Sequence, residues 1–328
     1  MPGMTARGTA MAAALALGLL PTLLAATAWA FTLADQTGRA LTLAAPPARI
    51  ISLVPSVTEI LFAIGAQDRL VGVTDFCDFP PEARNKPRVG SMLAPSLETI
   101  VALRPDVLVA TTAGNREETR KQLGRLRIPV FAVNPSSADE VLDLVERLGE
   151  LTGRRAAAAA LTGSLRTRMR SVAVRVAALP RPRVLYVLWP EPLIVPGRGA
   201  LVSELIALAG GQSVTIAGGE GYPRYSVEAA VAQGPEVIIL AQHGFQARPI
   251  AREQWERFTS LPAIKAGRLH SVDGSLFHRY GPRVVDGLEE LARLFHPEAF
   301  DRASGRSDPA HGPEPVPPRS DVAGGKPR

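Results

Sequence analysis

The sequence predicts an α/β protein of two similar lobes, each a mainly parallel sheet flanked by helices, joined by one long backbone helix. Three observations predict this fold class: a segment that occurs twice, an alternation of strand and helix patterns, and a long helical stretch between the halves. Residues 96–109 return as residues 226–239, with the Ser, the Glu, the Pro and the following acid at one constant offset. In each copy Ser is a suitable N-cap, Glu lies in the first helical turn, and Pro precedes a buried strand.

The first half of the chain alternates strands and helices. Strands are expected at residues 49–53, 70–73, 107–110 and 130–133, and helices at residues 55–65 and 115–125. Ser56 and Glu59 have the S-x-x-E spacing of a capping box, which gives Glu59 a structural role at the start of the first helix. Such alternation is typical of parallel βα units in a sheet covered on both faces.

The second half repeats this pattern. Strands are expected at residues 183–188, 237–240 and 269–272, and helices at residues 201–209, 227–233 and 282–295. As in the first half, this alternation is typical of parallel βα units in a sheet covered on both faces. The two halves therefore predict one lobe each.

A helical stretch lies between the two halves. Residues 139–151 and 154–179 are rich in Ala, Leu, Arg and Glu, with Gly149 and Gly153 near the ends. At 1.5 Å per residue the second piece extends about 37 Å, which is long enough to cross from one lobe to the other. Because a helical connector is stiffer than flexible strands, we expect only a small closure of the lobes.

The N-terminal residues predict export. Arg7 precedes an apolar stretch at residues 11–26, and an A-x-A signal-peptidase pattern follows at residues 28–30. The stretch is shorter than the about 20 residues of a membrane span, and Pro21 interrupts it. No Cys follows it to carry a lipid anchor. We therefore expect a cleavable signal peptide and a periplasmic protein that begins near Phe31.

These patterns divide the chain into five segments. We expect a signal peptide at residues 1–30, an N-terminal α/β lobe at 46–150, a connecting helix at 151–180 and a C-terminal α/β lobe at 181–300. Residues 301–328 are rich in Pro, Gly, Ser and charge, which predicts a disordered tail.

Composition and motifs argue against two classes of function. The net charge is +6, but no run of Lys and Arg is interleaved with aromatic residues, so nucleic-acid binding has little support. The sequence contains no G-x-S-x-G elbow and no Walker A run, and the lone G-x-G at residues 197–199 is typical of a tight turn. We therefore expect a protein that is not an enzyme and needs no cofactor.

Cysteine and histidine usage points to structural roles. Cys77 is the only cysteine and cannot form an internal disulfide, so it is expected to be a small buried residue. His243, His270, His278 and His296 show no metal-ligand spacing. A metal site is therefore not predicted.

Three runs of sequence resemble the class III periplasmic binding proteins, the helical-backbone receptors of ABC importers for vitamin B12, ferric siderophores, haem and some metals. The runs are residues 49–59, 71–81 and 89–98, and the resemblance extends over residues 46–296. The cobalamin-binding branch is the most similar, because Phe76, Tyr222 and Arg279 match two of its aromatic residues and its Arg in the loop before the last helix. The resemblance implies two lobes with a ligand cleft between them.

The chain departs from the family patterns at three positions. Met92 stands where the vitamin B12 receptor has a Trp, and Ser275 stands where it has an Asp, although Asp273 lies close by. Haem receptors of this family have a ligating Tyr near Ser91, and no Tyr stands there in this chain. The family is therefore better defined than the ligand.

The resemblance implies a large, partly apolar ligand. The expected ligand-binding residues are Pro55, Phe76, Met92, Trp189, Tyr222 and Arg279. Phe79, Leu93, Tyr225 and Phe277 are further candidates for the cleft, although Phe79 and Phe277 are equally expected in the core. Aromatic faces can lie on a corrin ring, and the Arg279 guanidinium can donate hydrogen bonds to corrin amides.

The repeated glutamates are expected to contact the importer. In the family that the chain resembles, the residues at Glu98 and Glu228 dock onto basic residues of the two permease subunits. The alternative is that each carboxylate only stabilises the start of its own helix. The sequence thus predicts a monomeric receptor that captures a corrinoid, vitamin B12, and delivers it to the permease dimer of an inner-membrane ABC importer. A ferric-siderophore or haem receptor is the alternative.

Overall fold

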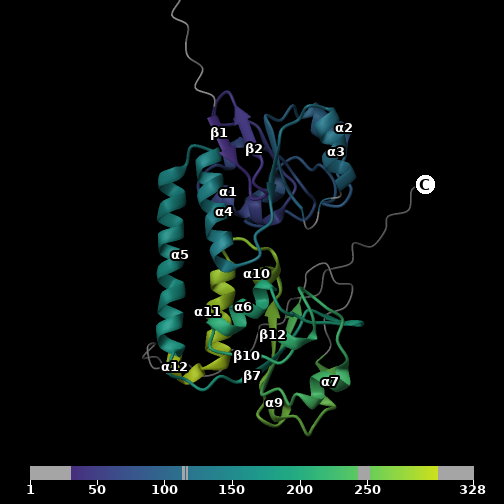
Figure 1. The fold of residues 1–328 in the computed structure, drawn as a ribbon, viewed down its shortest axis with the longest axis vertical. Coiled ribbons are helices and arrows are strands. Elements are labelled where there is room, and N and C mark those ends of the chain that lie inside the picture. Colours follow the sequence, from purple (N-terminus) through teal and green to yellow (C-terminus); the bar gives the residue numbers. More distant parts are fainter. Residues whose placement is uncertain (1–30, 113–114, 116, 243–251, 302–328) are drawn as a thin grey trace, which may run out of the picture.

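The computed structural model describes residues 31–112, 115, 117–242 and 252–301. These residues form two α/β lobes, one above the other in Figure 1, with the long helix α5 (Arg155–Val176) running beside both. The predicted fold class of two sheet-and-helix lobes is therefore confirmed. The predicted signal peptide, the tail from residue 302 and His243 lie outside the described residues.

The N-terminal lobe contains a parallel four-stranded sheet in the order β4-β3-β5-β6. The strands are β3 (Ile50–Ser52), β4 (Leu70–Val73), β5 (Val107–Thr111) and β6 (Val130–Val133). All four lie where the apolar runs predict strands. A separate antiparallel hairpin of β1 (Phe31–Ala34) and β2 (Ala40–Leu43) follows the predicted signal peptide.

The helices of this lobe cover its sheet. They are α1 (Pro55–Ala63), α2 (Leu97–Ala102), α3 (Glu117–Arg125) and α4 (Ala138–Leu151), with short 3-10 turns at Gln67–Arg69 and Pro81–Asn85. The predicted capping box at the start of α1 is wrong. Pro55 occupies the first helical turn, the N-cap is Val54, and no side chain caps the helix. The Glu59 carboxylate instead accepts hydrogen bonds from Arg283 in the other lobe.

The C-terminal lobe repeats this architecture. Its parallel sheet has the order β10-β7-β11-β12 and consists of β7 (Arg183–Val187), β10 (Gln212–Ser213), β11 (Val237–Gln242) and β12 (Leu269–Asp273). A small hairpin joins β8 (Trp189–Pro190) to β9 (Leu193–Ile194). The helices are α6 (Leu201–Leu208), α7 (Val227–Ala232), α8 (Glu253–Glu256), α9 (Pro262–Lys265), α10 (Ser275–His278), α11 (Val284–Phe295) and α12 (Pro297–Asp301), with a 3-10 turn at Ile216–Gly218.

The two copies of the repeated segment have the same local structure. Ser96 and Ser226 are N-caps of α2 and α7, and each accepts a hydrogen bond from the N–H three residues on, at 3.2 and 3.0 Å. Asp106 and Glu236 follow the Pro of each copy and accept a hydrogen bond from an N–H at the start of the adjacent strand, at 2.8 Å in both lobes. The acid after the Pro therefore links the strand that follows it to the adjacent strand through a hydrogen bond.

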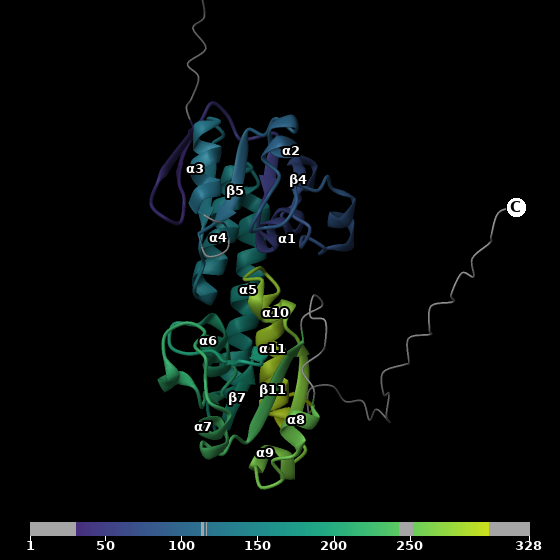
Figure 2. The same ribbon diagram turned by 90° about the vertical axis from the view of Figure 1, so that its right-hand side faces the viewer.

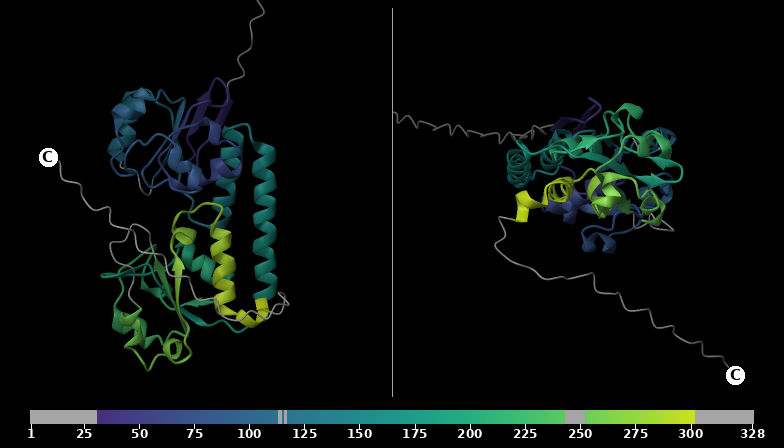
Figure 3. Two further views of the ribbon diagram at one scale, coloured as in Figure 1. Left: turned by 180° about the vertical axis from the view of Figure 1, so that it is seen from behind. Right: turned by 90° about the horizontal axis from the view of Figure 1, so that it is seen from below.

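The long helix α5 holds the lobes together. Its 22 residues span about 33 Å, and it packs against α4 in the upper lobe and α11 in the lower lobe. Arg168 of α5 pairs with Asp286 and Glu289 of α11 at 2.6 and 2.9 Å. The view from behind shows α5 along one edge of both lobes (Figure 3), and in the side view it lies behind the other elements and passes from one lobe to the other (Figure 2).

The helix α4 contributes to the cores of both lobes. Ala138, Val141 and Leu142, in its first turns, are buried in the same cluster as Tyr186 and Phe277 of the C-terminal lobe. The later residues of α4 are buried against α1 and the N-terminal sheet: Leu144, Val145, Leu148 and Leu151. In the part of the chain that the structure describes, no helix combines the length and the apolarity that crossing a membrane requires.

Candidate functional site

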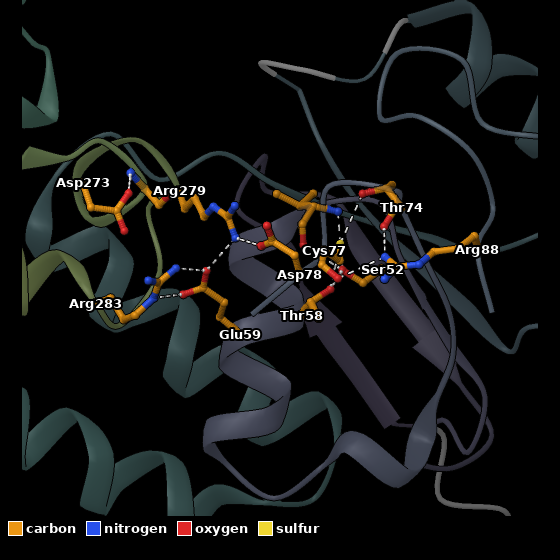
Figure 4. A network of polar contacts seen from close by, with 12 residues as sticks. Ser52, Thr58, Glu59, Thr74, Cys77, Asp78, Arg88, Asp273, Arg279 and Arg283 are labelled. Carbon is orange, nitrogen blue, oxygen red and sulfur yellow. Dashed lines mark hydrogen bonds and ion pairs between the residues drawn. The ribbon is translucent and has the colours of Figure 1, made fainter. Parts of the chain in front are cut away.

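Four charged side chains connect the two lobes (Figure 4). Glu59 and Asp78 belong to the N-terminal lobe, and Arg279 and Arg283 belong to the segment between α10 and α11 of the C-terminal lobe. We call these four residues the interlobe network. Because the two carboxylates face two guanidinium groups, the network has no net charge.

The buried half of the interlobe network is a bidentate ion pair. Glu59 accepts hydrogen bonds from Nε and Nη2 of Arg283 at 2.9 and 2.7 Å. The Glu59 side chain is only 3% exposed and that of Arg283 17% exposed. A third contact joins Glu59 to Nη1 of Arg279 at 3.5 Å. Paired, planar donors and acceptors of this kind fix orientation as well as charge.

The outer half of the interlobe network is more open to solvent. Asp78 Oδ1 accepts a hydrogen bond from Arg279 Nη1 at 2.5 Å, with side chains 45% and 21% exposed. This hydrogen bond from Arg279 holds the pKa of the Asp78 carboxyl below its usual range. Arg279 therefore bridges the two carboxylates of the N-terminal lobe.

Aromatic side chains lie next to these charges on the loop that follows β4. The Arg283 guanidinium carbon lies 3.8 Å from the centre of the Phe79 ring, which is a cation–π contact across the lobes. Phe76 and Phe79 are both large exposed apolar residues, 46% and 38% exposed. The loop thus presents apolar surface directly beside Asp78.

A buried thiol anchors this loop. The Cys77 Sγ lies 3.2 Å from the hydroxyls of Thr58 and Thr74, and burial raises the pKa of the thiol. Arg88 Nη1 donates to the backbone carbonyls of Thr74 and Cys77 at 2.6 and 3.0 Å. Cys77 is buried, as expected. Its contacts fix the backbone directly before Asp78.

Aromatic residues of the C-terminal lobe contact one another next to Arg279. The hydroxyls of Tyr222 and Tyr280 lie 2.8 Å apart, and Tyr280 directly follows Arg279. The ring of His278 meets the ring of Tyr222 at 5.9 Å, and its Nε2 lies 2.9 Å from the Tyr186 hydroxyl. Burial raises the pKa of Tyr222, so its hydroxyl stays protonated.

The other expected ligand residues lie on loops of both lobes. Pro55 begins α1, one turn before Glu59, and is half-buried. The Met92 carbonyl accepts a hydrogen bond from Asn115 Nδ2 at 2.7 Å, while Asn115 Oδ1 accepts one from the Thr111 N–H. Asn115 is only 6% exposed, and its role in holding the Met92 loop has no signature in the sequence.

Trp189 lies in a strand rather than in a free loop. It pairs with Ile194 in the β8–β9 hairpin, and Ile194 forms a bridge with Arg224, two residues after Tyr222. The indole Nε1 donates to the Glu191 carbonyl at 3.1 Å. The hairpin therefore connects Trp189 to the Tyr222 segment through backbone pairing.

Two further aromatic candidates pack within the C-terminal lobe. Phe277 is fully buried, and its ring meets Tyr186 edge-on at 5.7 Å, so its expected place in the cleft is wrong and the core alternative holds. A Cβ at Gly287 would lie only 2.8 Å from this ring, which shows how closely α11 packs there. Tyr225 packs against the apolar cluster on the other face of the C-terminal sheet. Leu93, in contrast, is 53% exposed.

The two repeated glutamates are exposed on equivalent helices. Glu98 lies in the first turn of α2 and Glu228 in the first turn of α7. Figure 1 shows α2 and α7 on the same side of the molecule, one in each lobe and both away from α5. The backbone N–H of Glu228 and the Ser226 hydroxyl hold the pKa of the Glu228 carboxyl below its usual range. Both side chains are therefore open to a partner.

The described residues contain no cluster of three or more potential metal ligands. His296 is buried and lies 3.3 Å from the Gly210 carbonyl, and His270 has a buried Nε2 without a hydrogen-bond partner. Two open concavities lie away from the interlobe network. One of about 320 Å³ is lined by Arg181, Arg268 and Glu298, and one of about 460 Å³ lies between α4 and α5.

Comparison with known proteins identifies similar sequences. The family model for "Periplasmic binding protein" matches residues 50–276. A vitamin B12-binding protein of Vibrio cholerae is 28% identical over 246 residues, which is 75% of this chain and 88% of the relative. An uncharacterized ABC transporter substrate-binding lipoprotein of Bacillus subtilis is 28% identical over 276 residues, which is 82% of this chain and 86% of the relative.

Solved structures with the same fold bind different ligands. The periplasmic vitamin B12-binding protein of Vibrio cholerae has a TM-score of 0.68 and 27% identity, over 78% of this chain and 98% of that protein. A periplasmic haem-binding protein from Pseudomonas aeruginosa has a TM-score of 0.69 and 29% identity, over 76% of this chain and 93% of that protein. The two ligands are thus represented at equal similarity.

Proposed function

Because the chain belongs to the periplasmic binding protein family, the substrate-binding components of ABC importers, we propose that it captures a corrinoid in the periplasm and delivers it to an importer. Members of this family take part in transport rather than in catalysis. Relatives that bind vitamin B12 and haem are 28% and 29% identical to this chain, so the ligand and its contacts are the subject of the proposal.

One observation supports the corrinoid most directly. Exposed Phe76 lies on the loop whose Asp78 meets Arg279 of the other lobe, so a broad apolar face and a multidentate donor adjoin each other. A corrinoid combines a wide macrocycle with many peripheral amides, and it needs both kinds of contact. Aromatic faces stack on the macrocycle, while a guanidinium donates to amide carbonyls.

The remaining expected residues complete this arrangement. Tyr222 and Trp189 supply aromatic surface on the C-terminal side, while Pro55 and Met92 supply apolar surface on the N-terminal side. All four are partly exposed, which leaves part of each side chain available for contact with a ligand. The Tyr222 hydroxyl and the Trp189 indole N–H form hydrogen bonds within the protein, which hold the two aromatic rings in fixed positions.

A haem receptor is the second candidate. It is favoured by the haem-binding protein of Pseudomonas aeruginosa, whose identity and TM-score equal those of the vitamin B12-binding protein within a few hundredths. The flat porphyrin also suits the aromatic surface. Against haem ligation stands the segment at residues 89–98, which carries no Tyr.

A ligand panel tests the proposal. Mature protein beginning at Phe31 is titrated with cyanocobalamin, cobinamide, haemin and a few ferric siderophores, with binding measured by calorimetry and by tryptophan fluorescence. Trp255 is 3% exposed in the core, so ligand contact should be reported through Trp189, and Trp189→Phe is the control for that assignment. We expect both corrinoids to bind and haemin to show no spectrum of axial ligation.

Replacement of Tyr222 tests whether this residue contacts the ligand. Tyr222→Ala should weaken corrinoid binding about tenfold or more, because it removes a stacking face as well as a partner of Tyr280. Tyr225→Ala is not a suitable control because Tyr225 packs against a core cluster, so Ile216→Ala, an exposed apolar position of the same lobe, is used. Tight binding of a siderophore or haemin without a corrinoid response would overturn the ligand assignment and leave the family membership intact.

A further inference from the structure

The side chain of Arg279 has two carboxylate partners in the N-terminal lobe. Its Nη1 donates to Asp78 at 2.5 Å and lies 3.5 Å from Glu59 Oε1, so both contacts use the same end of the guanidinium. Guanidinium groups carry five N–H donors, and these contacts leave the others for a further acceptor. Arg279 can therefore accept a new partner without losing Asp78.

The charges around Arg279 are already balanced. Glu59 and Asp78 match Arg279 and Arg283 one for one, with Glu59 fully enclosed. The guanidinium of Arg88, on the far side of the loop, donates to two backbone carbonyls. Arg84 also acts on Asp78, but its side chain is exposed and solvent screens it. No surplus positive charge of the interlobe network remains to neutralise a ligand carboxylate.

A neutral ligand acceptor and a charged one would interact differently with Arg279 and the Asp78 carboxylate beside it. An amide carbonyl needs only a free N–H. A carboxylate would lie within a few ångström of the Asp78 carboxylate, and like charges at that distance disfavour each other's ionised form. It must then take up a proton, displace Asp78 or bind weakly.

We propose that Asp78 determines the charge preference of the interlobe site, by holding Arg279 so that neutral amide-bearing ligands are accepted and carboxylate-bearing ligands are disfavoured. The inference rests on the proposed function, because it requires the ligand to reach Arg279. It adds the residue that distinguishes amides from acids. Burial of Asp78 is only partial, so a substitution there is accommodated without opening the core.

The test uses pairs of ligands that differ only in charge. Cyanocobalamin is compared with each of its monocarboxylate isomers, in which one side-chain amide is hydrolysed, and haemin is compared with its dimethyl ester. The ratio of the two dissociation constants within a pair cancels any effect of a variant on lobe closure or on folding. Wild type, Asp78→Asn and Asp75→Asn are measured in the same buffer by calorimetry.

Asp75→Asn is the matched control. It removes the same charge from the same loop, three residues earlier, but the Asp75 side chain is exposed and its backbone N–H, not its carboxylate, bonds to Gly90. A purely long-range effect of charge would change both variants alike. Thermal unfolding of the two variants checks that each is folded.

Wild type should bind the neutral member of a pair more tightly. In Asp78→Asn the affinity of the most disfavoured carboxylate, relative to its neutral partner, should rise about tenfold or more, because a charge-assisted hydrogen bond to Arg279 becomes available. In Asp75→Asn the same ratio should change less than about threefold.

Each other outcome has a distinct meaning. If corrinoids bind and the ratio in Asp78→Asn equals that of wild type, the role of Asp78 is overturned while the proposed function stands. If only the haemin pair binds and its ratio shifts, the corrinoid assignment is overturned and the role of Asp78 stands. If neither pair binds wild type, both the proposed function and the role of Asp78 are overturned.

Discussion

At the scale of single residues, Glu59 has the most enclosed charge of the interlobe network. Its carboxylate is anchored by α1 of one lobe and receives two hydrogen bonds from Arg283 at the start of α11 in the other. Transferring both groups out of water is costly, and only the bidentate geometry and the additional contact with Arg279 offset that cost. Removal of one partner should therefore destabilise the protein by more free energy than the intact pair contributes to its stability.

Glu59→Gln should destabilise the protein by about 2–3 kcal/mol, because the amide keeps the shape of the side chain but leaves Arg283 without a counter-charge. Urea unfolding measured by circular dichroism gives the free energy of unfolding. The value lies below the cost of a fully buried pair because Arg283 retains some access to water.

Glu150→Gln is the control for this measurement. Glu150 pairs with Arg155 at the surface, where both side chains are more exposed, so its loss should cost less than about 1 kcal/mol. Equal destabilisation by the two substitutions would mean that the Glu59–Arg283 pair is no more important than an exposed one.

The Glu59–Arg283 pair also shows what a sequence pattern cannot predict at the residue scale. The S-x-x-E spacing predicts a capping box, because local spacing is what a sequence pattern contains. Pro55 instead begins the helix at an earlier residue, and the partner of Glu59 lies 224 residues away in the sequence. The ligand-binding set, from Pro55 to Arg279, stays a prediction, while Phe277 is corrected to the core because apolar aromatic character alone does not distinguish the two environments.

At the scale of elements, the repeated segment places one short helix with one exposed Glu in each lobe. The helices α2, with Glu98 in its first turn, and α7, with Glu228 in its first turn, lie on the side of the molecule away from α5. We propose that these carboxylates dock onto basic residues of the importer's two membrane subunits. Opposite charges at two matched places guide encounter and set the orientation of the complex.

Glu98→Arg combined with Glu228→Arg should abolish uptake and the stimulation of importer ATPase, while ligand affinity and stability change little. Transport in proteoliposomes and calorimetric ligand titration measure the two properties separately. The helix-start alternative predicts a loss of only about 0.3–1 kcal/mol of stability for each helix and normal transport.

Asp68→Arg combined with Glu253→Arg is the control. Both residues are exposed acids in the first turns of other short helices, one in each lobe, and the pair changes the net charge equally. Transport at the wild-type rate in the Glu98 and Glu228 variant, or an equal loss in the control, would remove the docking role.

Most elements follow from the sequence, and those that do not have a physical reason. The strands β5 and β11 are buried along nearly their whole length, so each appears as a mainly apolar run. The hairpins β1–β2 and β8–β9 are not among the predicted elements. β1 and β2 are largely exposed and show no continuous buried apolar run, while β8 and β9 have only two residues each, which is too short to show a period.

At the scale of the whole molecule, two separate sets of contacts join the lobes. The helix α5 packs against both lobes, and the interlobe network joins them at the boundary. Apo and ligand-bound protein should therefore have the same radius of gyration within experimental error. Small-angle X-ray scattering with and without saturating ligand measures this, and a clear decrease on binding would contradict the stiff connection.

The residues of α4 that are buried in the C-terminal lobe have a consequence for folding. Ala138, Val141 and Leu142 precede the last strands of that lobe by many residues, yet they fill its core together with Tyr186 and Phe277. A fragment that begins after α5 would lack these side chains and expose the apolar surface that they cover. The two lobes are thus architectural units but not autonomous folding units, and unfolding of one withdraws part of the core from the other.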